Sequence, residues 1–115
     1  MITTGKTIFD LLEAHAPLVA LVGTNMFPLI APEGTASPFL LYQRSFEVIR
    51  TKDGPANSSS AIIINIISEK YLETIDISTA VHNALKGEAN LLSGTEVYEE
   101  GAFIQTLTFQ FWSAP

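Results

Sequence analysis

The chain has 115 residues, 47% of them hydrophobic and 16% charged, which suits one domain with a single core, and its lack of cysteine excludes disulfides and cysteine-ligated metal clusters. Twelve acidic residues against six basic ones give a formal net charge of -6. Because sequence-independent binding of DNA or RNA depends on clustered lysine and arginine, this balance argues against specific nucleic-acid recognition.

The N-terminal segment is predicted to be helical. Apolar residues recur at three- and four-residue steps from residue 7 to residue 15, which places them on one stripe of an amphipathic helix. Pro17 interrupts this helix, because proline lacks an amide hydrogen and clashes with the preceding turn. A short second helical segment is expected through residues 18–22, and Gly23 is expected to end it.

Three strands are predicted in the middle of the chain. Three prolines and one glycine between residues 25 and 38 leave room for a short edge strand at Met26–Leu29 and an irregular connection. Residues 39–50 alternate between bulky apolar and polar side chains, which predicts a strand covered on one face. Residues 61–68 hold five isoleucines around Asn65, a composition typical of a central strand.

The last third of the chain returns to a helix and then to strands. A helical period through Tyr71–Lys86 predicts a helix that Gly87 ends. A polar loop is expected at residues 87–94, followed by a short strand at Glu96–Tyr98 and a long strand at Ala102–Trp112. These elements predict an α+β fold in which two helices pack on one face of a small, mostly antiparallel sheet of four to five strands.

Residues suited to catalysis or metal binding are few. His15 and His82 are the only histidines, and neither belongs to a metal-binding spacing. Glu99 and Glu100 are adjacent, so in a strand they would point to opposite faces, and a solvated hairpin explains them better than an acid–base pair. Gly5-Lys6-Thr7 resembles the end of a phosphate-binding loop but lacks the earlier glycine and the preceding strand. We therefore predict a protein that is not an enzyme and uses no metal or cofactor.

The most polar segment of the chain is Thr51–Ser60. It is predicted to be a loop of about ten residues between two long strands, which exceeds the usual hairpin connection. Loops of this kind are either binding elements or plain mobile connections, and composition favours neither. A small antiparallel sheet also leaves edge strands that invite pairing with another chain. Assembly with other subunits is therefore the leading functional hypothesis.

No targeting or membrane segment is expected. Residues 1–10 hold a single lysine and no sustained apolar run, so they lack the features of a secretion signal. The longest nearly uncharged apolar stretch, Ala61–Ile67, is far shorter than the roughly 20 residues that a membrane helix needs. We expect a protein that folds in the cytoplasm and has no membrane partner.

Short segments follow the N-terminal helix in a set order: Leu21-Val22-Gly23, Met26-Phe27-Pro28, Ala31-Pro32-Glu33-Gly34 and Pro38-Phe39-Leu40-Leu41. A strand around Asn65, a helix at Tyr71–Leu85 and a closing strand at Thr106–Trp112 come later. In this order and spacing the chain resembles, over nearly its whole length, the tail-completion or tail-terminator proteins of long-tailed bacteriophages. Members of that family typically have a charged residue where this chain has Asn65.

The resemblance implies a subunit that closes into a hexameric ring on the end of the tail tube, stops tube growth and offers a docking face for the head-completion or neck protein. It implies a virion protein of the tail that is assembled in the host bacterial cytoplasm. Rings need heterologous interfaces, for which exposed edges at Met26–Leu29 or Phe103–Trp112 are candidates. An acidic subunit also suits a ring through which DNA passes, because like charge discourages phosphates from binding.

Two sets of contact residues are expected. The polar loop is expected to order against the tail tube protein through Thr51, Lys52, Asp53, Gly54, Asn57, Ser58 and Ser59. Contacts between subunits are expected to include Met26, Phe27 and Trp112. The same features would also serve a related neck protein, since a fold does not determine function.

A second hypothesis is a small-molecule or peptide-binding α+β domain in which the sheet and helices enclose a pocket. Such a pocket needs convergent polar groups on an apolar wall, and Asn65 with Tyr42 is the candidate pair. A third hypothesis, an enzyme with an unrecognised site, is disfavoured by the sparse histidines and the absence of cysteine.

Overall fold

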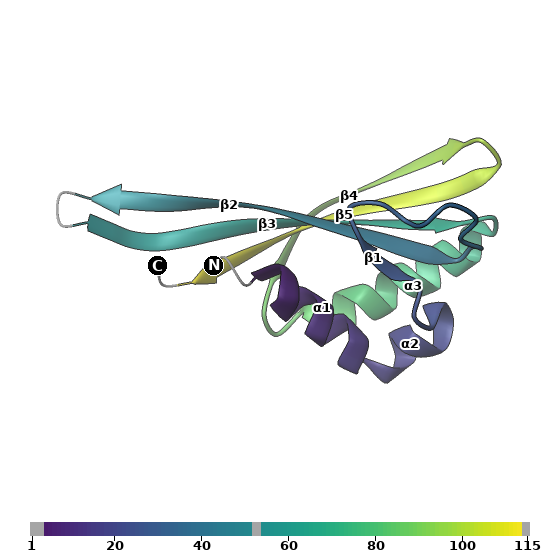
Figure 1. Ribbon diagram of the computed structural model, residues 1–115, viewed down its shortest axis with the longest axis horizontal. Coiled ribbons are helices and arrows are strands. Elements are labelled where there is room, and N and C mark those ends of the chain that lie inside the picture. The colour runs from purple at the N-terminus through teal and green to yellow at the C-terminus, as the bar shows by residue number, and fades with distance from the viewer. Residues whose placement is uncertain (1–3, 52–53, 114–115) are drawn as a thin grey trace.

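The computed structural model describes residues 4–51 and 54–113. It forms α1 (Thr4–Ala14), α2 (Ala16–Val22), β1 (Met26–Pro28), β2 (Phe39–Thr51), β3 (Gly54–Ser68), α3 (Tyr71–Leu85), β4 (Asn90–Glu99) and β5 (Ala102–Ser113). The strands form one sheet, and all three helices lie on the same face of it (Figure 1). The expected α+β fold is confirmed. The structure has three helices where two were expected to pack on the sheet, and α2 is the additional one. Pro17 lies in the first turn of α2, where proline is tolerated.

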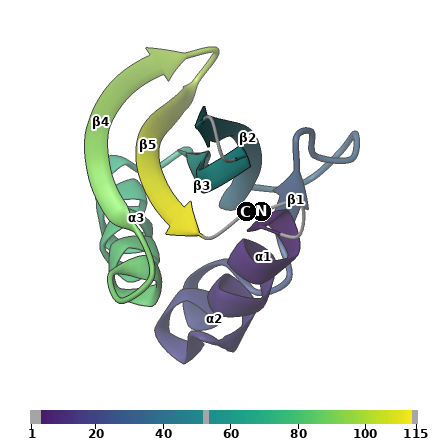
Figure 2. The same cartoon turned by 90° about the vertical axis from the view of Figure 1, so that its left-hand side faces the viewer.

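The strand order in the sheet is β1-β2-β3-β5-β4. β1 and β2 are parallel, and the other neighbouring pairs are antiparallel. α3 connects β3 to β4, and the chain then returns through β5, which fills the position between them. β3 therefore lies at the centre, β4 forms one border of the sheet, and β1 and β2 form the other (Figure 2).

The hydrophobic core lies between the helices and one face of the sheet. Ile62, Ile64 and Ile66 alternate along β3 and are buried to 1% exposure or less, beside Leu107 and Phe109 of β5. α1 contacts β2, α3 contacts β3 and β5, and α2 packs on the other two helices. The helices contribute Ile8, Leu12, Leu18, Ile77, Val81 and Leu85. The predicted central strand and the predicted long strand at Ala102–Trp112 are both confirmed.

Buried polar groups determine where the chain turns from β3 into α3. Ser68 is fully buried; its hydroxyl accepts a hydrogen bond from the Lys70 backbone N–H at 3.0 Å and donates one to Glu73 Oε1 at 2.5 Å. Thr74 is also fully buried and accepts a long bond from Gln105 Nε2 at 3.4 Å. Because buried polar groups need partners, these bonds hold the first turn of α3 against the sheet.

The prediction of a ten-residue loop at residues 51–60 is wrong. β2 continues to Thr51 and β3 begins at Gly54, and the two strands pair in register with a bulge at Ile49/Arg50. A polar segment can form a strand when its backbone groups pair with a neighbouring strand, whatever its side-chain composition. Lys52 and Asp53 lie outside the described residues.

β4 is longer than predicted. The expected loop at residues 87–94 ends at Asn90, where β4 begins, and a bulge interrupts its pairing with β5 between Leu91 and Ser93. Gly94 follows the bulge, and a Cβ at this position would lie 3.3 Å from the Leu107 side chain. A glycine there allows close approach of the two strands, so it marks a strand position and not a loop.

The turn between β4 and β5 contains Glu100 and Gly101, both with positive φ, at 52° and 82°. Glu99 pairs with Ala102 across it. Two central residues with positive φ are typical of the tight hairpin turns that match strand twist. The prediction that Glu99 and Glu100 belong to a hairpin is confirmed.

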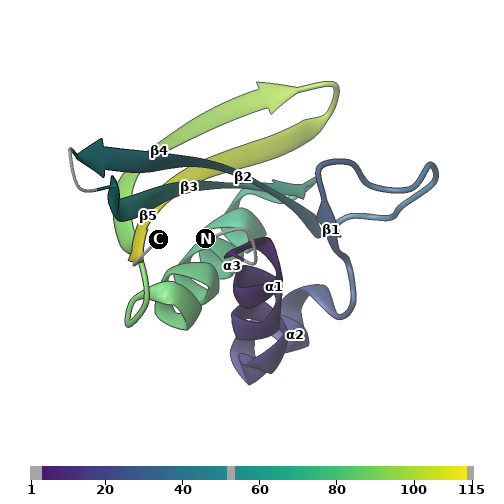
Figure 3. The ribbon, with the colours of Figure 1, turned by 60° about the vertical axis from the view of Figure 1, so that its left-hand side comes forward.

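The molecule is elongated, with extents of 51 × 27 × 24 Å. Its long dimension is due to the β2–β3 arm (residues 45–51 and 54–60), which projects away from the helices (Figures 1 and 3). β5 pairs with β3 as far as Ser58, so the tip of the arm has two strands only. Within the described residues, none of the helices is long and apolar enough to cross a membrane.

Substitution of Leu40 by alanine tests the position of the core. Leu40 is fully buried, so the change is expected to lower the free energy of unfolding by about 2–5 kcal/mol through lost contacts and a cavity. The same change at Leu72, which is 74% exposed on α3, is expected to alter it by no more than about 0.5 kcal/mol. Chemical denaturation at one protein concentration measures both variants, and equal losses would contradict this core.

Candidate functional site

The catalytic candidates do not come together. His15 is half-buried where α1 meets α2, whereas His82 is exposed on α3 and stacks on Phe109 with 6.5 Å between the ring centroids. Gly5-Lys6-Thr7 lies within α1 and follows no described strand. Among the described residues, no three His, Asp or Glu side chains are grouped so that they could hold a metal ion. The distinctive features of the molecule are instead its exposed surfaces.

The sheet face opposite the helices, here called the open face, carries a band of apolar side chains. Cross-strand register aligns Val97, Ile104, Ile67 and Phe39 in one row from β4 to β2. Val97 is 50% exposed and the other three are half-buried. No described helix covers this row (Figure 3). An apolar band across an uncovered sheet face is a feature of protein interaction surfaces.

Asn65 lies in the next row of the open face. Its Oδ1 accepts a hydrogen bond from the Thr106 hydroxyl at 2.6 Å, and its other neighbour in register is Leu41. Tyr42 points to the helix face, where its ring lies 6.1 Å from that of Phe9, and burial raises the pKa of its hydroxyl. The two side chains are therefore on opposite faces of the sheet. The structure therefore does not bring together Asn65 and Tyr42, the candidate pair of the alternative hypothesis of a binding pocket.

β4 is the most exposed element of the sheet. All ten of its residues are exposed, although it lies within a hydrogen-bonded ladder. Four of them are large and apolar: Leu91, Leu92, Val97 and Tyr98 are 42%, 56%, 50% and 63% exposed. Val97 lies on the open face, whereas Tyr98 and Leu91 pair with Phe103 and Phe109 on the helix side, so β4 exposes apolar side chains on both faces of this border. Exposed apolar residues on an edge strand are a feature of strands that can pair with another chain.

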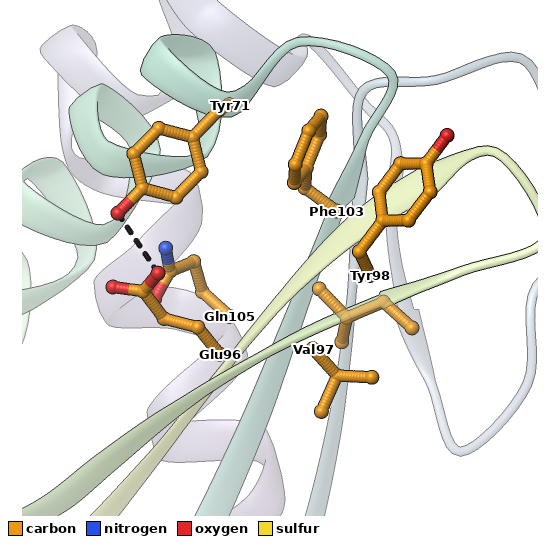
Figure 4. A pocket seen from close by; sticks show the side chains of 7 residues that line it. Tyr71, Glu96, Val97, Tyr98, Phe103 and Gln105 are labelled. Carbon is orange, nitrogen blue, oxygen red and sulfur yellow. Dashed lines mark hydrogen bonds between the residues drawn. The ribbon is translucent and has the colours of Figure 1, made fainter.

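A shallow hollow lies between the start of α3 and the β4–β5 hairpin. Tyr71 of α3 donates a hydrogen bond to Glu96 Oε2 of β4 at 2.8 Å, while Phe103 lies between the Tyr71 and Tyr98 rings, 5.5 Å and 4.7 Å from their centroids (Figure 4). The bond to Glu96 raises the pKa of Tyr71 because it stabilises the protonated phenol. The hollow measures about 210 Å³, below the roughly 300–1,000 Å³ of ligand pockets.

Charge is unevenly distributed along the chain. Residues 69–101 include seven acidic and two basic side chains, whereas residues 44–52 include three basic and one acidic. The first segment contains α3, β4 and the turn after it, and the second follows β2 into the β2–β3 arm. The two borders of the sheet therefore carry opposite charge balances.

The residues predicted to contact the tail tube belong to the β2–β3 arm. Thr51 ends β2, and Gly54, Asn57, Ser58 and Ser59 lie in the first half of β3. Lys52 and Asp53 lie outside the described residues. The structure thus places the described members of this set together on one projecting element.

The three predicted subunit contacts are separated. Met26 is 6% exposed and belongs to the core, so its side chain is not available to a partner. Phe27 is half-buried on β1 at the border of the sheet. Trp112 lies in β5 opposite Ser59, near the base of the arm. The expected exposed edge at Phe103–Trp112 is also wrong as far as Gln110, because β4 pairs with β5 up to that residue.

Sequence reasoning missed the apolar surface of β4. Leu91-Leu92 and Val97-Tyr98 are visible in the sequence, but Leu91-Leu92 fell within an expected polar loop. It also missed Ile30, which is 78% exposed, although Leu29 before it, which is 70% exposed, belonged to the expected edge at Met26–Leu29. A run of paired large apolar residues among polar ones was the available signal.

The fold is similar to those of two solved proteins. A chain in the virion of a native gene transfer agent particle superimposes with a TM-score of 0.77 at 17% identity, over 94% of this chain and 92% of that one. The gp17 protein of bacteriophage SPP1 superimposes with a TM-score of 0.59 at 15% identity, over 95% of this chain and 87% of that one. No protein-family profile matches the chain, and no curated protein does. The arrangement of three helices on one face of a five-stranded sheet is thus one that also occurs in phage-related proteins.

Proposed function

We propose that this chain is a structural subunit of a phage-type virion that closes into a ring on the end of the tail tube. The observation that carries the proposal is the similarity of the whole fold to a chain of the gene transfer agent virion, which covers more than nine-tenths of both chains. The order of segments that resembles tail terminators supports the finer assignment to tube capping. The protein would act by contact and catalyse no reaction.

The exposed surfaces support a role in assembly. A subunit that works alone has no use for a long edge strand with four exposed apolar residues, whereas a ring subunit buries such a strand in each contact with its neighbour. Ring contacts are heterologous, so each subunit needs two different patches. The two borders of this sheet differ in sequence and in charge, as such a pair requires. Six copies per ring are proposed from the resemblance.

The β2–β3 arm is proposed to contact the tail tube protein. It projects beyond the helices, so its tip can reach the subunits on which the ring sits (Figure 1). The residues proposed for this contact are Thr51, Lys52, Asp53, Gly54, Asn57, Ser58 and Ser59. A paired arm costs less to order on binding than a flexible loop would, which suits a docking element.

The opposite side of the ring is proposed to receive the head-completion or neck protein. The net charge of -6 suits a ring through which DNA passes without being held, because like charges repel over short distances. The ring would stay in the tail of the virion after assembly in the host cytoplasm.

The oligomeric state is the first test of this proposal. Native mass spectrometry and negative-stain microscopy of the purified protein, alone and with tail tubes, are expected to detect closed rings. The apolar surface of β4 provides the driving force for closure. A protein that stays monomeric at high concentration and leaves tube ends bare would contradict the proposed function.

A shortened arm tests the contact with the tube. Ile49 and Asn57 pair across the arm, so replacement of residues 50–56 by Asn-Gly is expected to close it with a two-residue turn and leave the core intact. The thermal midpoint should stay within a few degrees of the unmodified protein, while capping of tubes should be lost. A matched control carries Leu72→Ala on the exposed side of α3, keeps the arm unchanged and should cap normally. Normal capping of tubes by the shortened protein would contradict the proposed role of the arm.

Alanine substitutions at Phe27 and Trp112 test the proposed subunit contacts. Both residues lie near borders of the sheet, and large aromatic side chains there contribute strongly to binding. Each change is expected to weaken ring formation by at least tenfold in the midpoint concentration, with a smaller effect on unfolding of the protomer. If a variant has a lower free energy of unfolding but forms rings normally, the substituted residue belongs to the core and not to a subunit contact.

A further inference from the structure

The sheet has two open backbone edges, one at each border. β4 is the last strand in the order β1-β2-β3-β5-β4, so one of its edges is unpaired within the described residues. At the other border, β1 pairs only with Leu40–Tyr42 of β2, and the Leu29 N–H reaches the Tyr42 carbonyl at 2.9 Å. From Gln43 to Thr51, no described strand lies beside β2 on that side.

We infer that β4 of one copy pairs, antiparallel, with Gln43–Thr51 of β2 in the next copy, so that the sheets of neighbouring subunits become continuous. The inference rests on the proposed ring and identifies the contact that closes it. A second copy of this chain is thus the partner of both edges. β1 would lie in line with the neighbour's β4, each covering a different part of β2.

The strand directions within one copy favour this arrangement. β2 and β3, β3 and β5, and β5 and β4 are all antiparallel, so β4 runs opposite to β2. Rotation about the ring axis preserves strand direction, so β4 meets β2 of the next copy in the antiparallel sense. Register leads from Asn90 through Gln110 and Ala61 to Ser45, so the strands must be inclined to the ring axis for β4 to reach Gln43–Thr51, as strands in closed sheets are. Antiparallel ladders are slightly more stable per residue than parallel ones. The two edges also have nearly the same length, because β4 has ten residues and Gln43–Thr51 is one residue shorter.

β4 lacks most of the devices that keep edge strands from pairing. Natural monomers protect their edges with lysine, proline, very short strands or bulges. β4 has neither lysine nor proline, and its one bulge lies near its start, between Leu91 and Ser93. Beyond the bulge, Gly94–Glu99 forms a regular ladder with β5 and exposes Val97 and Tyr98.

The charges of the two edges are complementary. β4 carries Glu96 and Glu99 and no basic residue, whereas the open part of β2 carries Arg44 and Arg50 against a single Glu47. Opposite charges on paired strands stabilise a ladder, and like charges directly opposite one another destabilise it. Two copies of β4 would therefore pair less well with each other than β4 pairs with β2.

Engineered cysteines test the strand pairing directly, because the natural chain has none. Thr95 lies near the middle of β4 and shares the open face with Thr106. Residues 43, 45, 47 and 49 are alternate positions of β2, counted from Leu41. Thr95→Cys would be combined in turn with Gln43→Cys, Ser45→Cys, Glu47→Cys or Ile49→Cys. These four variants cover a range of registers.

Neighbouring strands bring Cα atoms to about 4.5–5.5 Å, within the range that a disulfide spans. Mild oxidation of rings is therefore expected to link the subunits of at least one of the four variants covalently. Non-reducing denaturing gels should then show a series of cross-linked species, from the dimer up to the full ring. The matched control combines Gln43→Cys with Thr79→Cys, which is exposed on α3 and away from the β4 edge, and should stay unlinked. Single-cysteine variants should form rings like the unmodified protein, which shows that the substitutions preserve the fold.

Three results separate the inference from the proposed function. A ladder specific to the Thr95 pairs supports the strand contact. Rings that form normally while all four pairs stay at the level of the Thr79 control would overturn the strand contact and leave the proposed function standing. Absence of self-association under every condition, with tail tubes included, would overturn both.

Discussion

Burial of the sheet on one face only is the constraint on which the rest of the molecule depends. Each Å² of apolar surface removed from water contributes roughly 25 cal/mol, and the helices cover the face that presents Ile62, Ile64 and Ile66. Within the described residues, no helix lies on the other face of the sheet. The open face and β4 therefore stay at the surface of the protomer, where another subunit can bury them. The fold and its proposed use in assembly have the same physical origin.

The elements that the sequence predicted correctly are those whose own hydrophobic pattern indicates which side is buried. The isoleucines of residues 61–68, the period of α3 and the alternation of β5 each contain their own burial signal, and all three elements are present. The segment Gly54–Ser60 carries no such signal, because only pairing with β2 makes it a strand. The exposure of Val97 and Tyr98 was also unpredictable, since it depends on where strand order places β4. Assembly as the leading hypothesis came from the expected polar loop and the expected sheet edges, but identifying the exposed residues of β4 needed the tertiary structure.

The hollow beside α3 explains how so exposed a strand can be well ordered. The bond from Tyr71 to Glu96 and the contacts among Tyr71, Phe103 and Tyr98 attach the far end of β4 to α3. An edge that is already held in place loses little conformational entropy when it pairs with a neighbour. These aromatic and carboxylate groups resemble a binding site in composition, yet their geometry is better suited to holding β4 in place than to enclosing a ligand.

An exposed edge is also a hazard before assembly, since it can pair with any strand. In this chain, charge limits the choice of partner. Two β4 edges would bring Glu96 and Glu99 of one copy near those of the other, a contact that ends at a dimer. Pairing of β4 with β2 brings acidic residues near arginines instead, and because the two edges are different the contact repeats from subunit to subunit until the ring closes. The net charge of -6 keeps free subunits apart in general, within a Debye length of about 8 Å. The local excess of arginine on β2 favours the head-to-tail contact of β4 with β2 despite this general repulsion between subunits.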